Sequence, residues 1–243
     1  MIIVVGRGHS GTRVLSHTLV ASGVYMGDRL NESGDLIPAE DMYEACRVMV
    51  RHVKYLGNLR WNFSKLHTMP IDPAFNSLLG SYLSSVLKCD AAWKGWKIPE
   101  TNLAYPWVVR RFPEAHYIYW VRDPRDVILQ PHVTDDLGDF GVAYDQTKSE
   151  RRRRAISWKY QAQIIQATPA PKNWLTVRLE DFVQNQMATL RRMEAFLGLE
   201  LDRIGVQPEV VGQYKQDEGE DCSGIFREDL VRLGYATTKE NTI

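Results

Sequence analysis

A short apolar run, a glycine-rich segment and a helical pattern follow one another at the start of the chain. Residues 2–5 (Ile-Ile-Val-Val) have the β-branched composition of a buried parallel strand. Gly6, Gly8 and Gly11 come next, and the apolar pattern resumes at residues 14–19. Glycines let the backbone approach an anion closely, and the start of a helix offers it free N–H groups. The pattern predicts a strand, a phosphate-binding loop and a helix.

Apolar positions along the rest of the chain predict alternating strands and helices. Strands are expected at 93–98, 117–121 and 174–177. Helices are expected at 41–56, 71–87, 103–111, 149–167, 186–197 and 227–233. Residues 23–38 and 135–141 carry glycines and acidic residues, and we expect loops there, the second of them mobile. This alternation favours an α/β fold of three layers, α/β/α, with a central parallel sheet and ligands at the carboxyl ends of its strands.

Composition narrows the class of protein. A chain of 243 residues with 44% hydrophobic and 25% charged residues suits a single domain over 1–243. The 30 basic and 30 acidic residues cancel, so we expect no nucleic-acid partner. Because no apolar run reaches the length of a membrane span or a signal peptide, and Cys46, Cys89 and Cys222 lack metal-ligand spacing, we expect a cytoplasmic protein with reduced thiols, no membrane partner and no metal.

The glycine-rich loop differs from that of nucleotide triphosphatases. Their pattern G-x-x-x-x-G-K-[ST] uses Lys on the phosphates and a hydroxyl on Mg²⁺. Gly6 and Gly11 fit this spacing, but Thr12 stands at the Lys position and Arg13 at the hydroxyl position. An Arg grips phosphate directly and does not bind magnesium. A P-loop kinase of a small molecule is therefore the second interpretation and not the first.

Three motifs resemble signatures of sulfotransferases that use 3′-phosphoadenosine 5′-phosphosulfate (PAPS). Residues 6–13 (GRGHSGTR) are similar to the family's 5′-phosphosulfate loop, and residues 116–127 (HYIYWVRDPRDV) to its strand running into R-[DEN]-P-[RK]-D-V. Residues 177–182 (VRLEDF) and 196–199 (FLGL) resemble a third element, and all occur in family order. The resemblance implies a P-loop-like sulfotransferase fold, PAPS as co-substrate without a metal, and a hydroxyl of a carbohydrate or other small molecule as acceptor.

The resemblance also assigns the residues that hold the donor. It gives the 3′-phosphate to Arg122, whose planar guanidinium meets phosphate oxygens in a bidentate way. In the family a Ser eight residues later completes this contact, and Gln130, whose amide still donates a hydrogen bond, stands there. The 5′-phosphosulfate falls to Arg7, Gly8, His9, Ser10, Gly11, Thr12 and Arg13.

Two further positions bear on the transferred sulfuryl group. The family places Lys or Arg just before the S-G-T or G-G-T of its loop, and His9 occupies that position here. We expect His9 to take this role, aided by Arg7; the alternative is a loop histidine that contributes only its backbone N–H. Lys97 resembles the family lysine that lies near the sulfuryl group, the alternative being a solvated strand end. Pro99 stands where phenol- and steroid-acting members have their catalytic His.

The proton acceptor is left open between two carboxylates. Carbohydrate- and tyrosine-modifying members use a glutamate, and Glu32 and Glu100 are the candidates here, each with an exposed surface carboxylate as the alternative. We expect Arg125 and Asp126 to form a surface ion pair or start a helix. Trp158 is expected in the core or, second, stacked on the adenine of the donor. Because His9, Pro99 and Gln130 depart from the family pattern, a non-catalytic nucleotide-binding relative is a further alternative.

Overall fold

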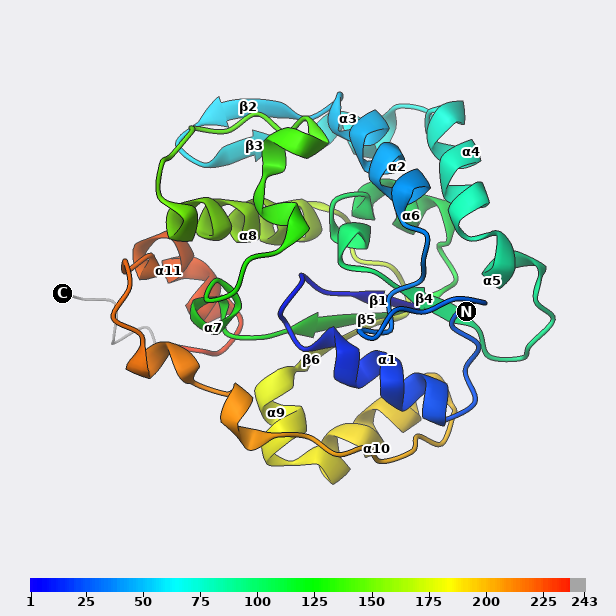
Figure 1. Cartoon of the computed structure of the whole chain (residues 1–243). Coiled ribbons are helices and arrows are strands. Elements are labelled where there is room, and N and C mark those ends of the chain that lie inside the picture. Colours follow the sequence, from blue (N-terminus) through cyan, green and yellow to red (C-terminus); the bar gives the residue numbers. More distant parts are fainter. Residues whose placement is uncertain (237–243) are drawn as a thin grey trace.

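A central sheet between two layers of helices forms the computed structural model, which describes residues 1–236 (Figure 1). Within these residues the sheet has four parallel strands in the order β4-β1-β5-β6. They are β1 (Ile2–Val5), β4 (Gly95–Lys97), β5 (His116–Val121) and β6 (Trp174–Arg178). The predicted strands and the three-layer α/β/α arrangement with a parallel sheet are confirmed.

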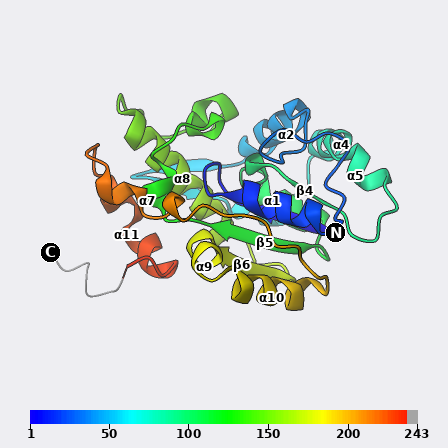
Figure 2. The ribbon, with the colours of Figure 1, turned by 60° about the horizontal axis from the view of Figure 1, so that its bottom comes forward.

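One face of the sheet carries helices that lie at the bottom of Figure 1 and come forward in Figure 2. Alternate strand residues point to this face, as the two-residue period of a strand requires, among them Ile2, Val4, Ile118 and Trp120. They pack against apolar residues of α1 (Thr12–Ala21), α9 (Leu179–Gln184) and α10 (Gln186–Leu197). The predicted helix at 186–197 is confirmed with its C-terminal glycine in the left-handed region.

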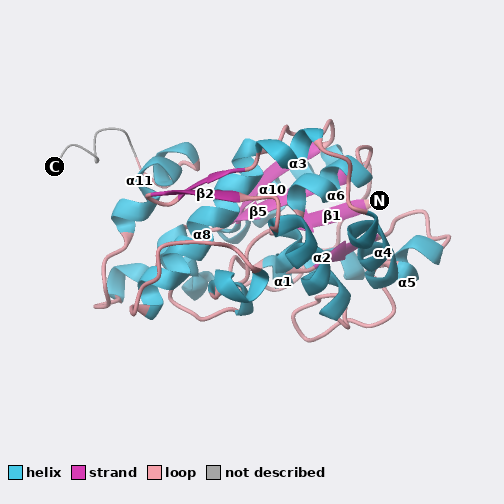
Figure 3. Cartoon of the chain, turned by 90° about the horizontal axis from the view of Figure 1, so that it is seen from above, coloured by secondary structure: helices cyan, strands magenta, loops and turns pink. Residues whose placement is uncertain are grey.

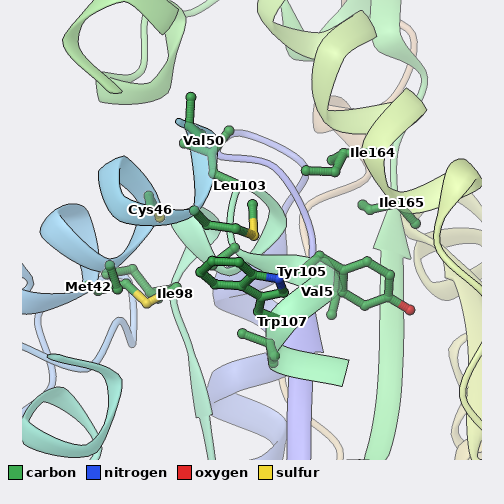
Figure 4. Close-up of a cluster of buried hydrophobic side chains, with 14 of the residues drawn as sticks. Val5, Met42, Cys46, Val50, Ile98, Leu103, Tyr105, Trp107, Ile164 and Ile165 are labelled. Atoms are coloured by element: carbon green, nitrogen blue, oxygen red, sulfur yellow. The ribbon is translucent and has the colours of Figure 1, made fainter. Parts of the chain in front are cut away.

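The other face carries a larger helical layer, which lies over the strands in Figure 3. Figure 4 shows side chains of α2, β1 and α8 converging around Trp107, which is fully buried. The ring of Phe75 meets that of Trp107 edge-on at 5.0 Å between centroids. The helices of this layer are α2 (Glu40–Val50), α3 (Ser64–Thr68), α4 (Pro73–Tyr82), α5 (Ser84–Lys88), α6 (Tyr105–Arg111) and α8 (Glu150–Ala167).

A smaller apolar cluster joins α7 (Pro124–Val127) and α8 to α11 (Ser223–Arg232). Trp158 lies in this cluster, 5% exposed, with its ring 5.1 Å from that of Phe226. The core interpretation of Trp158 is therefore confirmed. Among residues 1–236, no helix combines the length and apolar composition that a membrane crossing needs.

Three predicted segments differ from the structure. The helix expected at 41–56 ends at Val50, because the following residues form a hairpin of β2 (Lys54–Gly57) and β3 (Arg60–Asn62). The helix expected at 71–87 is interrupted at Leu83, between α4 and α5. The segment 135–141, expected to be a mobile loop, contains short 3-10 turns at η2 (Val133–Asp135) and η3 (Leu137–Phe140), packed by buried side chains.

Candidate active site

The loop between β1 and α1 is tightly folded and depends on glycine. Gly11 precedes the first residue of α1 with φ of 83°, and a Cβ at this position would lie 2.9 Å from a methyl carbon of Leu179. Glycine is required there for both reasons. His9 also has positive φ, 65°, which non-glycine residues rarely adopt outside functional loops. The Trp120 indole N–H donates to the carbonyl of Ser10 at 3.0 Å and holds the loop against β5.

A cavity of about 490 Å³ lies over this loop, at the carboxyl ends of the strands. It brings together most of the predicted donor-binding positions with Lys97 and Arg122. Its walls also include His132 and Asp35, which the sequence analysis did not single out. The residues that line it are Gly8, His9, Gly11, Thr12, Arg13, Val14, Ser33, Asp35, Lys97, Pro99, Arg122, His132, Leu179, Val183, Gly205, Val206, Gln207 and Val210.

Lys97 ends β4 with a buried side chain that forms an ion pair. Its Nζ donates to Oδ1 of Asp35 at 2.6 Å and to the carbonyl of Ser33 at 2.7 Å. Burial lowers the pKa of Lys97, and the carboxylate of Asp35 opposes that shift. The Leu36 N–H donates to the carbonyl of Lys97 at 3.1 Å, so the loop after α1 is bound to the end of β4. This long-range contact brings Asp35 into the cavity. The local sequence around Asp35 does not predict this position.

The two predicted proton acceptors lie in contrasting places, and neither lines the cavity. Glu32 is exposed on the loop after α1. Glu100 is 1% exposed in the turn η1 (Pro99–Asn102), and its Oε1 has no hydrogen-bond partner among residues 1–236. Burial raises the pKa of Glu100 to about 7, and the negative charge of Asp35 adds to that rise. The exposed-carboxylate interpretation therefore describes Glu32 and is wrong for Glu100.

Arg122 follows β5 and lines the same cavity. Its guanidinium donates to the carbonyls of His9, at 2.9 Å, and of Val210, and approaches Asp126 at 3.4 Å. The Nε of Arg122 is buried without a hydrogen-bond partner in the described part of the chain. Gln130 is exposed and does not line the cavity. The loop and Arg122 thus come together, while Gln130 stays apart.

Arg7 is buried beneath the loop surface and is paired with an acidic residue. Its guanidinium forms an ion pair with Asp135 and is 3% exposed. Burial lowers the pKa of Arg7, and the charge of Asp135 counteracts this. Arg7 does not line the cavity, and neither does the side chain of Ser10, which is also buried. We expected Arg7 to act beside His9 on the sulfuryl group. In the structure Arg7 does not reach the cavity.

The His9 side chain points to the neighbouring chain segment. Its Nε2 lies 2.7 Å from the carbonyl oxygen of Pro131, to which it donates when protonated at that nitrogen. Its ring lies edge-on to that of His132, with 5.7 Å between centroids. Burial lowers the pKa of His9, and the hydrogen bond to Pro131 works against that shift. His9 therefore borders the cavity while its Nε2 is engaged elsewhere.

Residues 205–217 run past the cavity from α10 towards α11, and we call this segment the strap; it is the orange trace in Figure 1. The carboxylate of Asp126 accepts hydrogen bonds from the Gly212 N–H at 2.7 Å and the Tyr214 N–H at 2.8 Å. Asp126 is 2% exposed, so the expectation of a surface ion pair is wrong for it. Asp126 instead fixes the strap beside Arg122.

Comparisons with known proteins agree with this geometry. A profile described as "Sulfotransferase family" matches residues 2–203. A sulfotransferase domain from the curacin biosynthetic pathway superposes with a TM-score of 0.62 at 13% identity, covering 97% of this chain and 98% of that domain. A sulfotransferase domain of the Synechococcus PCC 7002 olefin synthase gives 0.61 at 14% identity, covering 97% and 94%. At these identities the likeness concerns the fold. No curated protein matches by sequence.

Proposed function

Because the chain belongs to the sulfotransferase family, we propose that it transfers a sulfuryl group from PAPS to a hydroxyl group of a carbohydrate or other small molecule. The observation that carries this proposal is the convergence of the glycine-rich loop, Lys97 and Arg122 on one cavity. These groups supply amide hydrogens and fixed positive charge, which an anionic donor requires.

The donor fits the residues that line the cavity. The backbone N–H groups at the start of α1, from Gly11 to Arg13, hold the 5′-phosphosulfate, because Gly11 offers no side chain to cap that helix. Arg122 holds the 3′-phosphate, and its unpartnered Nε is a donor that a phosphate oxygen satisfies. The apolar wall formed by Leu179, Val183 and Val206 suits the adenosine.

The chemistry requires one bond to sulfur to form as another breaks. The acceptor oxygen bonds to sulfur while the bond from sulfur to the bridging oxygen breaks, and the electron pair stays on the departing 5′-phosphate. Lys97 stabilises the charge that develops on the transferring group and the departing oxygen. The acceptor proton passes to the carboxylate of Asp35, which lines the cavity beside Lys97.

A ligand panel tests the proposal. The melting temperature is measured with 3′-phosphoadenosine 5′-phosphate (PAP), its 2′,5′ isomer, AMP, and ATP with magnesium. PAP is expected to raise it more than the isomer or AMP, because only the 3′-phosphate reaches Arg122. Transfer is then measured as PAP released from PAPS in the presence of neutral oligosaccharides and small alcohols.

Each rival predicts a different pattern in that panel. Stabilisation and turnover with ATP and magnesium, but not with PAP, would establish a small-molecule kinase. Stabilisation by PAP without transfer to any acceptor or to water would establish a non-catalytic relative. An Arg122→Gln variant, which loses the charge but keeps an amide donor, is expected to lose the preference for PAP over AMP.

A further inference from the structure

His132 is a cavity residue that the family signatures do not assign. It lies ten residues after Arg122 in the sequence, immediately before the turn η2. Its imidazole covers the glycine-rich loop so closely that a Cβ at Gly8 would lie 2.4 Å from Nε2 and 2.1 Å from Cδ2. Gly8 is therefore the residue type that lets the ring lie against the loop. The edge of the His132 ring that carries Cδ2 and Nε2 lies against the glycine-rich loop.

The other ring nitrogen of His132 meets hydrogen-bond donors. Nδ1 accepts the backbone N–H of Thr134 at 3.2 Å and lies 2.9 Å from the Thr134 hydroxyl oxygen. That hydroxyl oxygen also accepts the amide of Gln161 at 3.2 Å, and its own hydrogen is free to point to Nδ1. A nitrogen that accepts the backbone N–H of Thr134 carries no proton itself. The proton of the neutral ring is therefore on Nε2, on the side of the ring that lies against Gly8.

A buried chain of hydrogen bonds fixes this arrangement. The Asn102 amide donates to Oε1 of Gln161 at 3.2 Å, which orients the Gln161 NH₂ group towards Thr134. The same NH₂ group donates to the hydroxyl of Ser157 at 3.1 Å, and that hydroxyl donates to the carbonyl of Thr134 at 2.6 Å. These four side chains are at most 2% exposed. Because the hydrogen bonds of Gln161 and Ser157 both end at Thr134, the chain holds Thr134 in place beside the ring of His132.

The charges around His132 favour the neutral ring. Burial is the main cause that lowers the pKa of His132, and the positive charges of Arg7, His9 and Lys97 act in the same direction, so that together they bring it to about 3. Asp135, the one carboxylate bonded to this residue among residues 1–236, accepts the His132 backbone N–H at 2.5 Å and is itself paired with Arg7. A neutral ring with Nε2 protonated is a hydrogen-bond donor and not a base.

We propose that the Nε2–H of His132 donates a hydrogen bond to an oxygen of the transferring sulfuryl group. This inference rests on the proposed sulfotransfer, and it assigns to His132 the contact that the sequence assigns to His9. His9 has Nε2 engaged by Pro131, whereas His132 is bonded through Nδ1, its ring lies against Gly8, and it lines the cavity together with Lys97. A donor that is fixed before the reaction stabilises developing charge without reorganisation.

Two His132 variants separate a direct contact from a structural one. His132→Ala is expected to lower kcat about 10²-fold, while the Kd of PAP, which lacks the sulfuryl group, stays within about twofold. His132→Gln places an amide N–H near the position of Nε2 and is expected to recover at least tenfold of the loss. Unchanged kcat in His132→Ala, or equal losses in kcat and in PAP affinity, would overturn the proposal.

A measurement that needs no turnover completes the test. The ¹⁵N resonances of His132, assigned by their loss in His132→Gln, are expected to show protonated Nε2 and unprotonated Nδ1. Adding PAPS is expected to shift the Nε2–H resonance more than adding PAP. A proton on Nδ1, or equal shifts with both nucleotides, would contradict the role of His132. Failure of PAP and PAPS to bind would instead contradict the proposed function.

Discussion

Carboxylates in and near the cavity show how position decides the chemistry of one residue type. Asp35 lines the cavity and is paired with Lys97, Glu100 is buried with a raised pKa, and Glu32 is exposed to solvent. A general base must reach the proton that it removes, so accessibility from the cavity is the first criterion. Asp35 meets it, although the sequence analysis selected Glu32 and Glu100.

Asp35→Asn tests that choice. The amide still accepts the hydrogen bond from Lys97 but binds a proton far more weakly, so kcat is expected to fall about 10²-fold or more. Asp28→Asn, a change at an exposed carboxylate of the same loop, is the control. The readout is PAP release under saturating donor. A larger loss of kcat in Glu32→Gln or Glu100→Gln than in Asp35→Asn would transfer the role to that glutamate.

Glu100 affects stability in a pH-dependent way. Its pKa rises from the ordinary 4.5 to about 7 on folding, so between these values the folded state holds the proton more tightly than the unfolded chain. The free energy of unfolding therefore falls as pH rises from 4.5 to 7. Glu100→Gln removes this loss. The free energy of unfolding of the variant minus that of the unsubstituted protein is therefore expected to be larger at pH 8 than at pH 4.5, by on the order of 3 kcal/mol.

Urea unfolding at both pH values measures this difference. Glu114→Gln, a change at an exposed glutamate, is the matched control and is expected to show no comparable dependence on pH. If Glu100→Gln and the unsubstituted protein differ by the same free energy of unfolding at both pH values, folding does not raise the pKa of Glu100.

The strap forms one wall of the cavity, and the short helix α7 holds it in place. The carboxylate of Asp126, in α7, binds two backbone N–H groups of the strap and lies beside the guanidinium of Arg122. Arg125 stacks on the ring of Tyr214 at 4.0 Å and so adds a second attachment. Residues 122–127, which match the pattern R-[DEN]-P-[RK]-D-V, thus place Arg122 at the cavity and also anchor the strap.

Asp126→Asn is expected to loosen the strap. The amide accepts at one oxygen and presents an NH₂ group to the second backbone N–H, so one of the two hydrogen bonds is lost. We expect faster hydrogen exchange at Gly212 and Tyr214 and about tenfold weaker binding of PAP. Glu209→Gln, a change at an exposed side chain of the strap, is the control. Native exchange rates in Asp126→Asn would show that Asp126 does not anchor the strap.

The order of the strands assembles the cavity as a whole. All four strands point the same way, so the loop after β1, Lys97 at the end of β4, Arg122 after β5 and Leu179 after β6 meet at one edge. Apolar residues alternate between two separate cores, one on each face of the sheet. These cores hold the strands in register, and the cavity inherits its geometry from that register.

Local pattern was sufficient for much of this architecture. The β-branched run at 2–5, the glycines after it and the strong strand before Arg122 predicted the sheet and the glycine-rich loop between β1 and α1, because these signals act within a few residues. The three motifs predicted the family, which the profile over residues 2–203 confirms. Element ends were less well predicted, because the break at Leu83 and the hairpin after Val50 depend on packing.

Contacts between distant segments decided which side chains face the cavity. Asp35 enters it because Leu36 pairs with Lys97, and His132 enters it because Gly8 leaves room for the ring. Arg7 is drawn away by Asp135, and Glu100 is enclosed by the core. A sequence pattern fixes the type and order of residues, whereas the direction of a side chain follows from close packing and from charge pairing across the folded chain.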